Sequence, residues 1–226
     1  MNETEWKIPV GDDATRAVYE PATSANEKAV YVFAHGAGGN MADRSMLAAA
    51  KELRNRGFGV VRFNFLYKER GSGRPDPMPR LMNTVTAVVE RTRAELGSAG
   101  GRPLIIGGRS MGGRAASMLA ADDFDADGLL LLAYPLHPDG QPEKLRDAHL
   151  PRIKMPVLCI NGTRDGLCRR DLMERAVGTV TAPWEMHWLD GADHSFHVLK
   201  SSGRNDAAVV AEVGDVSERW LSGLMP

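Results

Sequence analysis

The sequence has little cysteine. Its 226 residues include only two, Cys159 and Cys168, and their spacing matches no metal-binding or redox motif. Cys159 lies within an apolar, strand-like run, where a thiol packs as a small hydrophobic side chain. We therefore expect no disulfide framework and a reducing, cytoplasmic setting.

An excess of charge of either sign is also absent, because 28 Lys and Arg residues and 29 Asp and Glu residues leave a formal net charge of −1. Such a balance gives no broad attraction to nucleic acid or to an anionic membrane. No apolar run approaches the roughly 18 residues of a membrane span. The segment Met1–Lys7 has neither the basic start nor the apolar core of a signal peptide. We expect no nucleic-acid or membrane partner, and a monomer or homodimer.

The residues that are present fit one globular domain. The hydrophobic share is 43% and the charged share 25%, which are ordinary values for such a domain. The chain is long enough for one α/β domain with a substantial core. It contains no internal repeat, low-complexity tract or domain-scale linker, so we expect a single domain over residues 1–226.

Apolar runs alternate with helical patterns along the chain. The runs predict buried strands at Ala29–Ala34, Gly59–Phe65, Pro103–Gly107, Gly128–Ala133, Pro156–Ile160 and Trp184–Leu189. Helices are predicted at about Asp43–Arg56, Leu81–Leu96, Arg114–Ala121 and Asp206–Leu221. The stretch to Pro21 predicts a hairpin at one edge of a sheet, and the loop Lys68–Pro79 is too rich in proline and glycine for regular structure.

Strands that are apolar throughout and alternate with helices indicate an α/β fold, with a mostly parallel, twisted sheet covered by helices on both faces. About twenty residues separate the strand ending at Ala133 from the strand beginning at Pro156, which is too few for a large cap domain. Sheets of this kind place their sites at the carboxyl ends of the strands. The site should therefore be formed by the loops that begin at His35, Leu66, Arg109, Tyr134, Asn161 and Asp190.

A serine lies in a glycine-rich turn between a predicted strand and a predicted helix. The sequence Gly108-Arg109-Ser110-Met111-Gly112 matches the nucleophile-elbow pattern, in which a strained turn exposes a serine hydroxyl. Glycine is needed on both sides because the strand and helix backbones approach closely. A plain Gly-Ser connector would look the same, so the rest of the chain must supply a base, an acid and an oxyanion hole.

A serine hydroxyl is a poor nucleophile until a base removes its proton. Among the six histidines, His194 follows the last predicted strand, and His197 is the alternative. Asp165 follows the preceding strand and can fix the tautomer of the histidine. Asp193 is the second candidate, but neighbouring side chains usually diverge, which favours Asp165. The order Ser110, Asp165, His194 is the one expected after a nucleophile elbow.

Acyl transfer also creates an oxyanion, which needs preorganised hydrogen-bond donors. The amide of Met111, the residue after the serine, supplies one. The segment His35–Gly39 ends an earlier strand and supplies a second; we predict the N–H of Ala37, with Gly38 as the alternative. A phosphate-binding turn is the competing interpretation, but the third glycine of a dinucleotide fingerprint and a Walker-type lysine motif are absent from the sequence.

Further residues of these loops are candidates for substrate contact. They are His35, Gly36, Gly38, Arg109 and Tyr67. Basic residues near the expected rim are candidates for attracting an anionic group of a substrate, with solvated loop charges as the alternative interpretation. They are Arg62, Lys68, Arg70, Arg74 and Arg109.

Taken together, the chain resembles an α/β-hydrolase and is most similar to the small, cap-less, dienelactone-hydrolase-like branch. The resemblance runs from about Val30 to the C-terminus and rests on His35–Gly39, Gly108–Gly113, Gly162–Asp165 and Gly191–Phe196. It implies the α/β-hydrolase fold and the catalytic triad. Dienelactone hydrolase has a cysteine nucleophile where this chain has Ser110, which favours general ester hydrolysis over dienelactone specificity.

We therefore expect a serine carboxylesterase that cleaves small-molecule acyl esters through Ser110, His194 and Asp165 and an acyl-enzyme, with no metal and no organic cofactor. Without a cap, the serine should lie in an open, shallow cleft. A peptidase or amidase with the same triad is one alternative. A non-catalytic hydrolase-fold protein, used for interaction or regulation, is the other.

Overall fold

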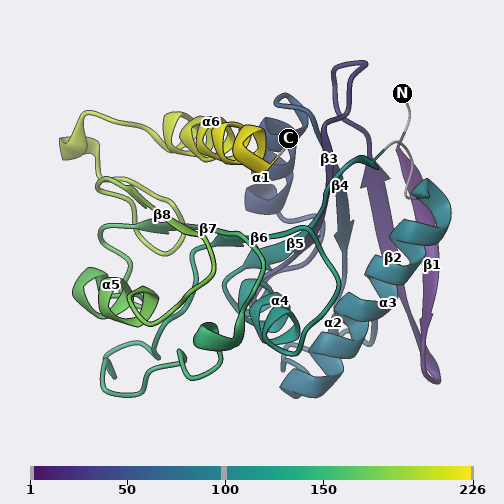
Figure 1. Cartoon of the computed structure of the whole chain (residues 1–226), viewed down its shortest axis with the longest axis horizontal. Helices are drawn as coiled ribbons and strands as arrows, with labels where there is room; N and C mark the ends of the chain where they lie inside the picture. Colours follow the sequence, from purple (N-terminus) through teal and green to yellow (C-terminus); the bar gives the residue numbers. More distant parts are fainter. Residues whose placement is uncertain (1–2, 98–100, 225–226) are drawn as a thin grey trace.

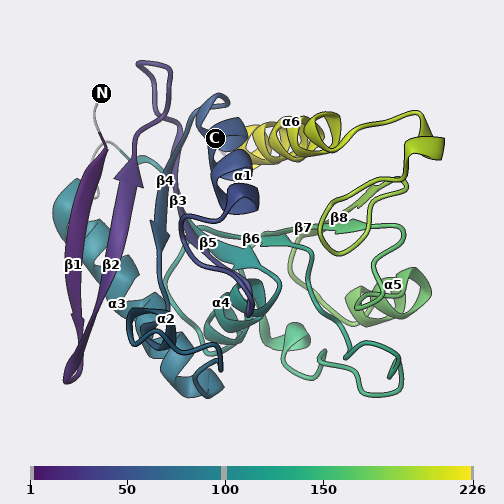
Figure 2. The same ribbon diagram turned by 180° about the vertical axis from the view of Figure 1, so that it is seen from behind.

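The computed structural model describes residues 3–97 and 101–224. Met1 and Asn2, part of the segment considered for a signal peptide, lie outside these ranges. An eight-stranded sheet in the order β1-β2-β4-β3-β5-β6-β7-β8 forms the centre of the molecule (Figure 1). The predicted hairpin is confirmed: β1 (Thr4–Val10) and β2 (Asp13–Glu20) pair antiparallel at one edge (Figure 2). β8 (Trp184–Leu189) is the other edge.

The central strands are buried along almost their whole length, as their unbroken apolar sequences require. They are β3 (Ala29–Ala34), β4 (Phe58–Phe63), β5 (Leu104–Arg109), β6 (Gly128–Leu132) and β7 (Val157–Gly162). From β4 to β8 all neighbours pair in parallel, so the carboxyl ends of these strands lie at one edge of the layer. The six predicted strands are confirmed to within two residues at each end.

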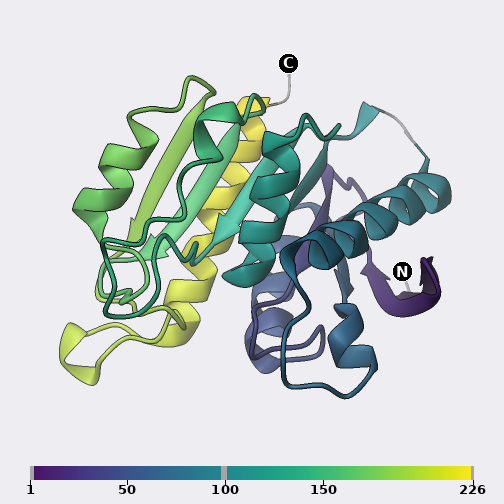
Figure 3. The same ribbon diagram turned by 90° about the horizontal axis from the view of Figure 1, so that it is seen from below.

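Two hydrophobic cores lie on opposite faces of the sheet, because successive side chains of a strand point to opposite sides. On one face α3 (Met78–Leu96), α4 (Met111–Ala121) and α5 (Arg170–Val177) cover the sheet. On the other face lie α1 (Arg44–Arg54) and α6 (Asp206–Leu224). Figure 3 shows the sheet between the teal helices α3 and α4 and the yellow helix α6. The expected α/β architecture without a large cap is confirmed.

The sequence pattern was wrong or silent for three helical segments. The loop expected at 68–79 begins within the short helix α2 (Leu66–Glu69), and α3 already starts at Met78. Pro79 fits the first turn of α3 because its missing N–H would have no helical partner there. Helix α5 was not predicted, since its eight residues offer too short a periodic pattern. Within the described ranges, no helix has the length and apolar character needed to cross a membrane.

Candidate active site

Ser110 occupies the turn between β5 and α4 in a sparsely populated backbone conformation, with φ 50° and ψ −117°. The flanking glycines make this turn possible. A Cβ at Gly108 would lie 2.5 Å from the carbonyl oxygen of Ala34. A Cβ at Gly112 would lie 2.6 Å from the carbonyl oxygens of both Ala34 and His35. The elbow geometry predicted from the sequence is therefore confirmed.

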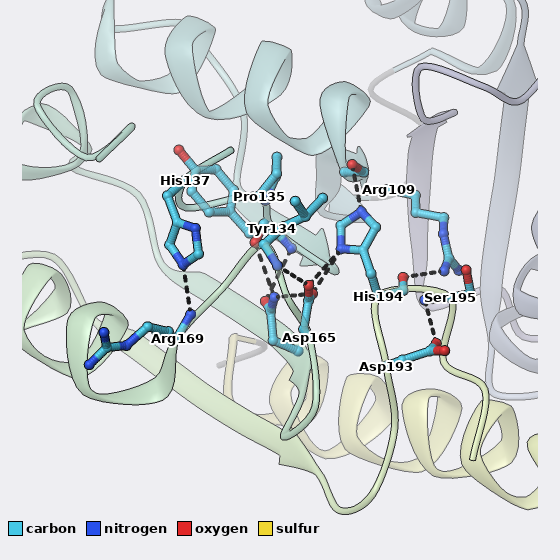
Figure 4. Close-up of polar contacts among 12 residues, drawn as sticks. Arg109, Tyr134, Pro135, His137, Asp165, Arg169, Asp193, His194 and Ser195 are labelled. Carbon is cyan, nitrogen blue, oxygen red and sulfur yellow. Dashed lines mark hydrogen bonds and ion pairs between the residues drawn. The ribbon is translucent and has the colours of Figure 1, made fainter. Parts of the chain in front are cut away.

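His194 lies between Ser110 and Asp165. Its Nε2 is 2.9 Å from Ser110 Oγ, and its Nδ1 is 2.8 Å and 3.0 Å from the two carboxylate oxygens of Asp165 (Figure 4). Since the carboxylate accepts the Nδ1 proton, the lone pair of Nε2 faces the serine hydroxyl. Three residues from the ends of three strands thus form one hydrogen-bonded chain.

Asp165 is held by donors other than His194. Its side chain is fully buried, and its carboxylate accepts the amide of Leu167 at 2.8 Å and the side-chain amide of Asn161 at 3.1 Å. Asn161 also exchanges hydrogen bonds of 3.1 Å with the backbone N–H and C=O of Tyr134. A buried carboxylate needs such partners. The sequence placed Asn161 at the start of a loop at the site but indicated no role for it; in the structure it is a buried polar residue of β7.

The alternative base and acid have other partners. The carboxylate of Asp193 accepts the backbone amide of Ser195 at 2.7 Å (Figure 4). It also accepts the backbone amide of His197 at 3.0 Å, so it shapes the loop around His194. The exposed ring of His197 is 2.9 Å from Asp206. Geometry therefore favours Asp165 over Asp193 and His194 over His197.

Arg109 connects the serine turn to the histidine loop. Its guanidinium donates a hydrogen bond of 2.7 Å to the carbonyl oxygen of His194 (Figure 4). It also lies 4.8 Å from the ring centre of Phe196. Burial lowers the pKa of Arg109, and the carboxylates of Asp165 and Asp193 oppose that shift. The side chain predicted to contact substrate thus also fixes the position of the loop that carries His194.

A cleft of about 370 Å³ lies in front of Ser110. Gly36, Ala37 and Gly38 form one wall, and the loop of His194 forms another. The start of α1 closes a third side. The glycine-rich segment after β3 is therefore next to the serine, where the sequence placed it, and Gly36 and Gly38 line the cleft as predicted.

His35 bonds to the backbone of this glycine-rich segment. Its ring is fully buried, with Nδ1 2.7 Å from the carbonyl oxygen of Gly36 and Nε2 accepting the amide of Phe65 at 3.1 Å. Burial lowers the pKa of His35 to about 4, so the ring is neutral at pH 7. In a trans peptide the N–H points away from the C=O, so the Ala37 N–H points away from the His35 ring.

Tyr67 fixes the next peptide unit. Its buried hydroxyl donates a hydrogen bond of 2.7 Å to the carbonyl oxygen of Ala37, which turns the N–H of Gly38 away from Tyr67. The side chains of His35 and Tyr67 are fully buried and do not line the cleft. Their predicted contact with substrate is corrected: both act through the backbone of the loop.

Most of the basic residues expected at the rim are engaged elsewhere. Arg62 is buried and pairs with Glu20 at 2.7 Å, and Arg70 pairs with Asp76. Of the five basic residues considered, only Arg109 lines the cleft among the described residues. The idea that this set attracts an anionic substrate therefore has no support from their positions.

The thiols and metal-ligating side chains form no second reactive centre in the part of the chain that the structure describes. Cys159 and Cys168 are free and buried, and burial raises the pKa of both thiols. No group of three or more His, Cys, Asp or Glu side chains is arranged to hold a metal ion within the described ranges.

A second serine–histidine pair, which the sequence did not indicate, lies in the core. Ser117 Oγ is 2.8 Å from His149 Nε2, and both residues are buried. The Ser117 hydroxyl also meets the carbonyl oxygen of Arg114 at 2.9 Å. Burial, followed by the charges of Arg114 and Arg152, lowers the pKa of His149 to about 4. Among the described residues no carboxylate bonds to this ring, so the pair lacks the acid found at His194.

Comparisons with known proteins give the same architecture. The model of the alpha/beta hydrolase domain matches residues 27–222. An alpha-beta serine hydrolase homologue from Coxiella burnetii is 19% identical, with a TM-score of 0.77 over 97% of each chain. A lidless serine hydrolase from Xanthomonas campestris is 20% identical, with a TM-score of 0.75 over 96% of this chain and 94% of that chain. Dienelactone hydrolase from Anabaena variabilis is 19% identical, with a TM-score of 0.75 over 98% and 97%.

Proposed function

The chain belongs to the α/β-hydrolase family, and from that membership we propose that it is a serine carboxylesterase acting on small acyl esters. The observation that carries the proposal is the hydrogen-bonded chain from Ser110 through His194 to Asp165. A serine next to an imidazole whose other nitrogen faces a carboxylate is the arrangement that activates a hydroxyl for acyl transfer.

Acylation begins when Nε2 of His194 takes the proton of Ser110 as Oγ attacks the ester carbonyl carbon. The C=O electrons move to the carbonyl oxygen, and the resulting oxyanion accepts hydrogen bonds from the amides of Met111 and Ala37. Asp165 stabilises the imidazolium ion. The intermediate then collapses: the C–O bond to the alcohol breaks, and His194 protonates the departing oxygen.

Deacylation repeats these steps with water as the nucleophile. His194 takes a proton from the water, the hydroxide attacks the acyl carbon, and the bond to Ser110 Oγ breaks as His194 returns the proton to the serine. The products are the carboxylic acid and the free enzyme. Each step uses only Ser110, His194, Asp165, the two backbone amides and water.

An ester is favoured over an amide by two considerations. The cleft of about 370 Å³ has walls made only of short loops and the start of α1, which suits a small substrate. One similar structure is named as a dienelactone hydrolase, and a lactone is a cyclic ester. A peptidase or amidase would use the same groups, so substrate comparison must separate the two.

The test compares p-nitrophenyl butyrate with the matched p-nitroanilide, using the wild-type protein and Ser110→Ala. We expect hydrolysis of the ester, with a far slower reaction of the anilide, and loss of ester hydrolysis in the variant. Ester hydrolysis that persists in a folded Ser110→Ala protein would overturn the proposal. Preference for the anilide would reassign the protein as an amidase.

A further inference from the structure

The cleft at Ser110 continues into a larger groove. This groove has a volume of about 690 Å³ and lies between α1, α6 and the loop after His194. Its lining shares Asp43, Ser45 and Ser195 with the cleft, so the two hollows are continuous. Figure 2 shows α1 beside α6. Residues of both helices line the groove. A substrate bound at Ser110 therefore has a path along α1.

The floor of this groove is apolar. Ala48 of α1, Phe196 of the histidine loop and Val210 of α6 line it. From Ser45, at the cleft, to Lys51, at the far end, the α1 helix advances by about 9 Å, given its rise of about 1.5 Å per residue. The apolar side chains that the groove offers to a hydrocarbon chain are those of Ala48, Phe196, Ala207 and Val210.

The carboxylates around the groove already have partners. Asp43 accepts the backbone and side-chain amides of Asn40 at 2.8 Å and 2.7 Å. Glu52 pairs with Arg56 at 2.6 Å. Asp206 pairs with His197 at 2.9 Å, which holds the pKa of Asp206 below its usual range, and the nearby charge of Arg44 adds to that effect. These acids are therefore neutralised or hydrogen-bonded locally.

The two cations that line the groove, Arg44 and Lys51, are in no direct ion pair among the described residues, unlike Glu52 and Asp206. Arg44 and Lys51 lie seven residues apart on α1, which places them on the same side of the helix, and both are exposed. Over the described ranges, no hydrogen bond or ion pair engages either side chain. Arg44 has the charge of Asp206 nearby, whereas Lys51 is the cation at the far end of this wall, and neither is held in a direct ion pair among the described residues.

We propose that this groove binds the distal part of the substrate, and that the substrate is an ester whose apolar chain ends in a carboxylate. The chain lies on Ala48 and Val210, and the terminal carboxylate meets Lys51, with Arg44 closer to the cleft. This inference rests on the proposed esterase function and names its substrate class. The rim arginines expected from the sequence take no part in it.

Two series of esters test the proposal and identify which side of the ester bond enters the groove. In the first, p-nitrophenyl monoesters of straight-chain dicarboxylic acids of increasing length carry the carboxylate on the acyl part. In the second, acetate esters of ω-hydroxy acids carry it on the alcohol part. Each is paired with a neutral ester of equal length. One series should show a kcat/KM optimum at a chain length that lets the carboxylate reach Lys51.

The variants are Lys51→Gln, Arg44→Gln and Lys51→Glu, with Lys7→Gln as the matched control because Lys7 is exposed on the distant edge strand β1. Lys51→Gln should raise KM for the preferred anionic ester about three- to fivefold, as expected for an exposed ion pair, and lower the anionic-to-neutral ratio of kcat/KM accordingly. Lys51→Glu should lower that ratio further. High salt should reduce the difference between wild type and Lys51→Gln. Lys7→Gln should leave the ratio unchanged.

Calorimetric binding of the dicarboxylate product to Ser110→Ala, with and without Lys51→Gln, separates the subsite from the activity. Equal KM values for wild type, Lys51→Gln and Lys7→Gln in both ester series would overturn the subsite while the esterase function stands. If no ester is cleaved, weaker dicarboxylate binding after Lys51→Gln would support the subsite and reject the esterase. Unchanged binding would then overturn both.

Discussion

Two serine–histidine pairs occur in this molecule at nearly the same separation, and they lie in opposite environments. Ser110 Oγ is 2.9 Å from His194 Nε2, and Ser117 Oγ is 2.8 Å from His149 Nε2. The first pair borders a cleft at the carboxyl ends of the strands. In the second pair Ser117 lies within α4, about two helical turns after Ser110, and both of its members are buried.

The differences between the pairs lie in the groups around them. Ser110 is in a strained turn, whereas Ser117 is inside a helix and has a backbone acceptor of its own at 2.9 Å. His194 faces a buried carboxylate, and its side chain is 28% exposed. His149 is buried without a carboxylate partner among the described residues. Only the Ser110–His194 pair therefore has the orienting acid and the position at a cleft that the proposed mechanism requires.

The largest expected effect is the difference in kcat/KM between the Ser110→Ala and Ser117→Ala variants. Ser110→Ala should lower kcat/KM for an ester by about 10⁴- to 10⁶-fold, as loss of a triad nucleophile does. Ser117→Ala should change kcat/KM by less than about threefold, but it should lower the free energy of unfolding by about 1–3 kcal/mol because it leaves the His149 nitrogen unpaired. Ester kinetics and denaturant unfolding measure both. Equal loss of activity in two folded variants would contradict the comparison.

The next prediction concerns Asp165, the carboxylate that bonds to the histidine of the Ser110–His194 pair. Asp165→Asn should lower kcat by about 10⁴-fold, because the histidine then loses its favourable tautomer. Glu212→Gln is the matched control, because the Glu212 carboxylate in α6 is also a histidine partner, 2.8 Å from Nε2 of His187 in β8. Steady-state kinetics of both variants provide the measurement. Near-normal kcat in Asp165→Asn would remove Asp165 from the proposed mechanism.

A smaller effect tests the oxyanion side of the reactive pair. Tyr67→Phe removes the hydrogen bond to the Ala37 carbonyl, which fixes the peptide unit next to the proposed donor, the Ala37 N–H. Because a shift of this loop would misplace that donor, the variant should lower kcat about tenfold with little change in KM. Tyr134→Phe is the control, because that hydroxyl donates to the Arg146 carbonyl at 2.7 Å. Both variants should lose about 1 kcal/mol of stability. A kcat of Tyr67→Phe equal to that of Tyr134→Phe would exclude this role.

The smallest effect concerns the buried pair and pH. His149 has a pKa of about 4 in the folded protein against about 6.5 in the unfolded chain, so the unfolded state binds more protons between these values. The contribution of the neutral His149 ring to the free energy of unfolding is therefore fully present above about pH 6.5. It is lost as the pH falls towards 4, by up to about 1.4 kcal/mol per pH unit. In urea unfolding, the free energy of unfolding should fall less between pH 7 and pH 5 in His149→Gln than in the wild type. Some of the fall should remain in the variant, because the pKa of His35 is lowered to about 4 as well. An unchanged slope would show that His149 is not buried as a neutral ring.

The sequence was sufficient for the sheet and for the residues that meet at its edge. Ser110, Asp165 and His194 each follow an apolar strand, and parallel strands bring such positions together. The hydrogen bonds that support these residues could not be predicted from the sequence. Tyr67 bonds to Ala37 across 30 residues and Asn161 to Tyr134 across 27, through strand neighbours that no local pattern specifies. The same limit hid the Ser117–His149 pair, which joins a helix to a distant loop.

A fluorophosphonate probe tests the central claim most directly, because it reports activation of a serine without knowledge of the substrate. The wild-type protein and Ser117→Ala are labelled in parallel with Ser110→Ala, and peptide mass spectrometry locates the adduct. We expect labelling at Ser110 in the first two proteins and none in Ser110→Ala. Labelling that persists in Ser110→Ala, or an adduct on Ser117, would contradict it.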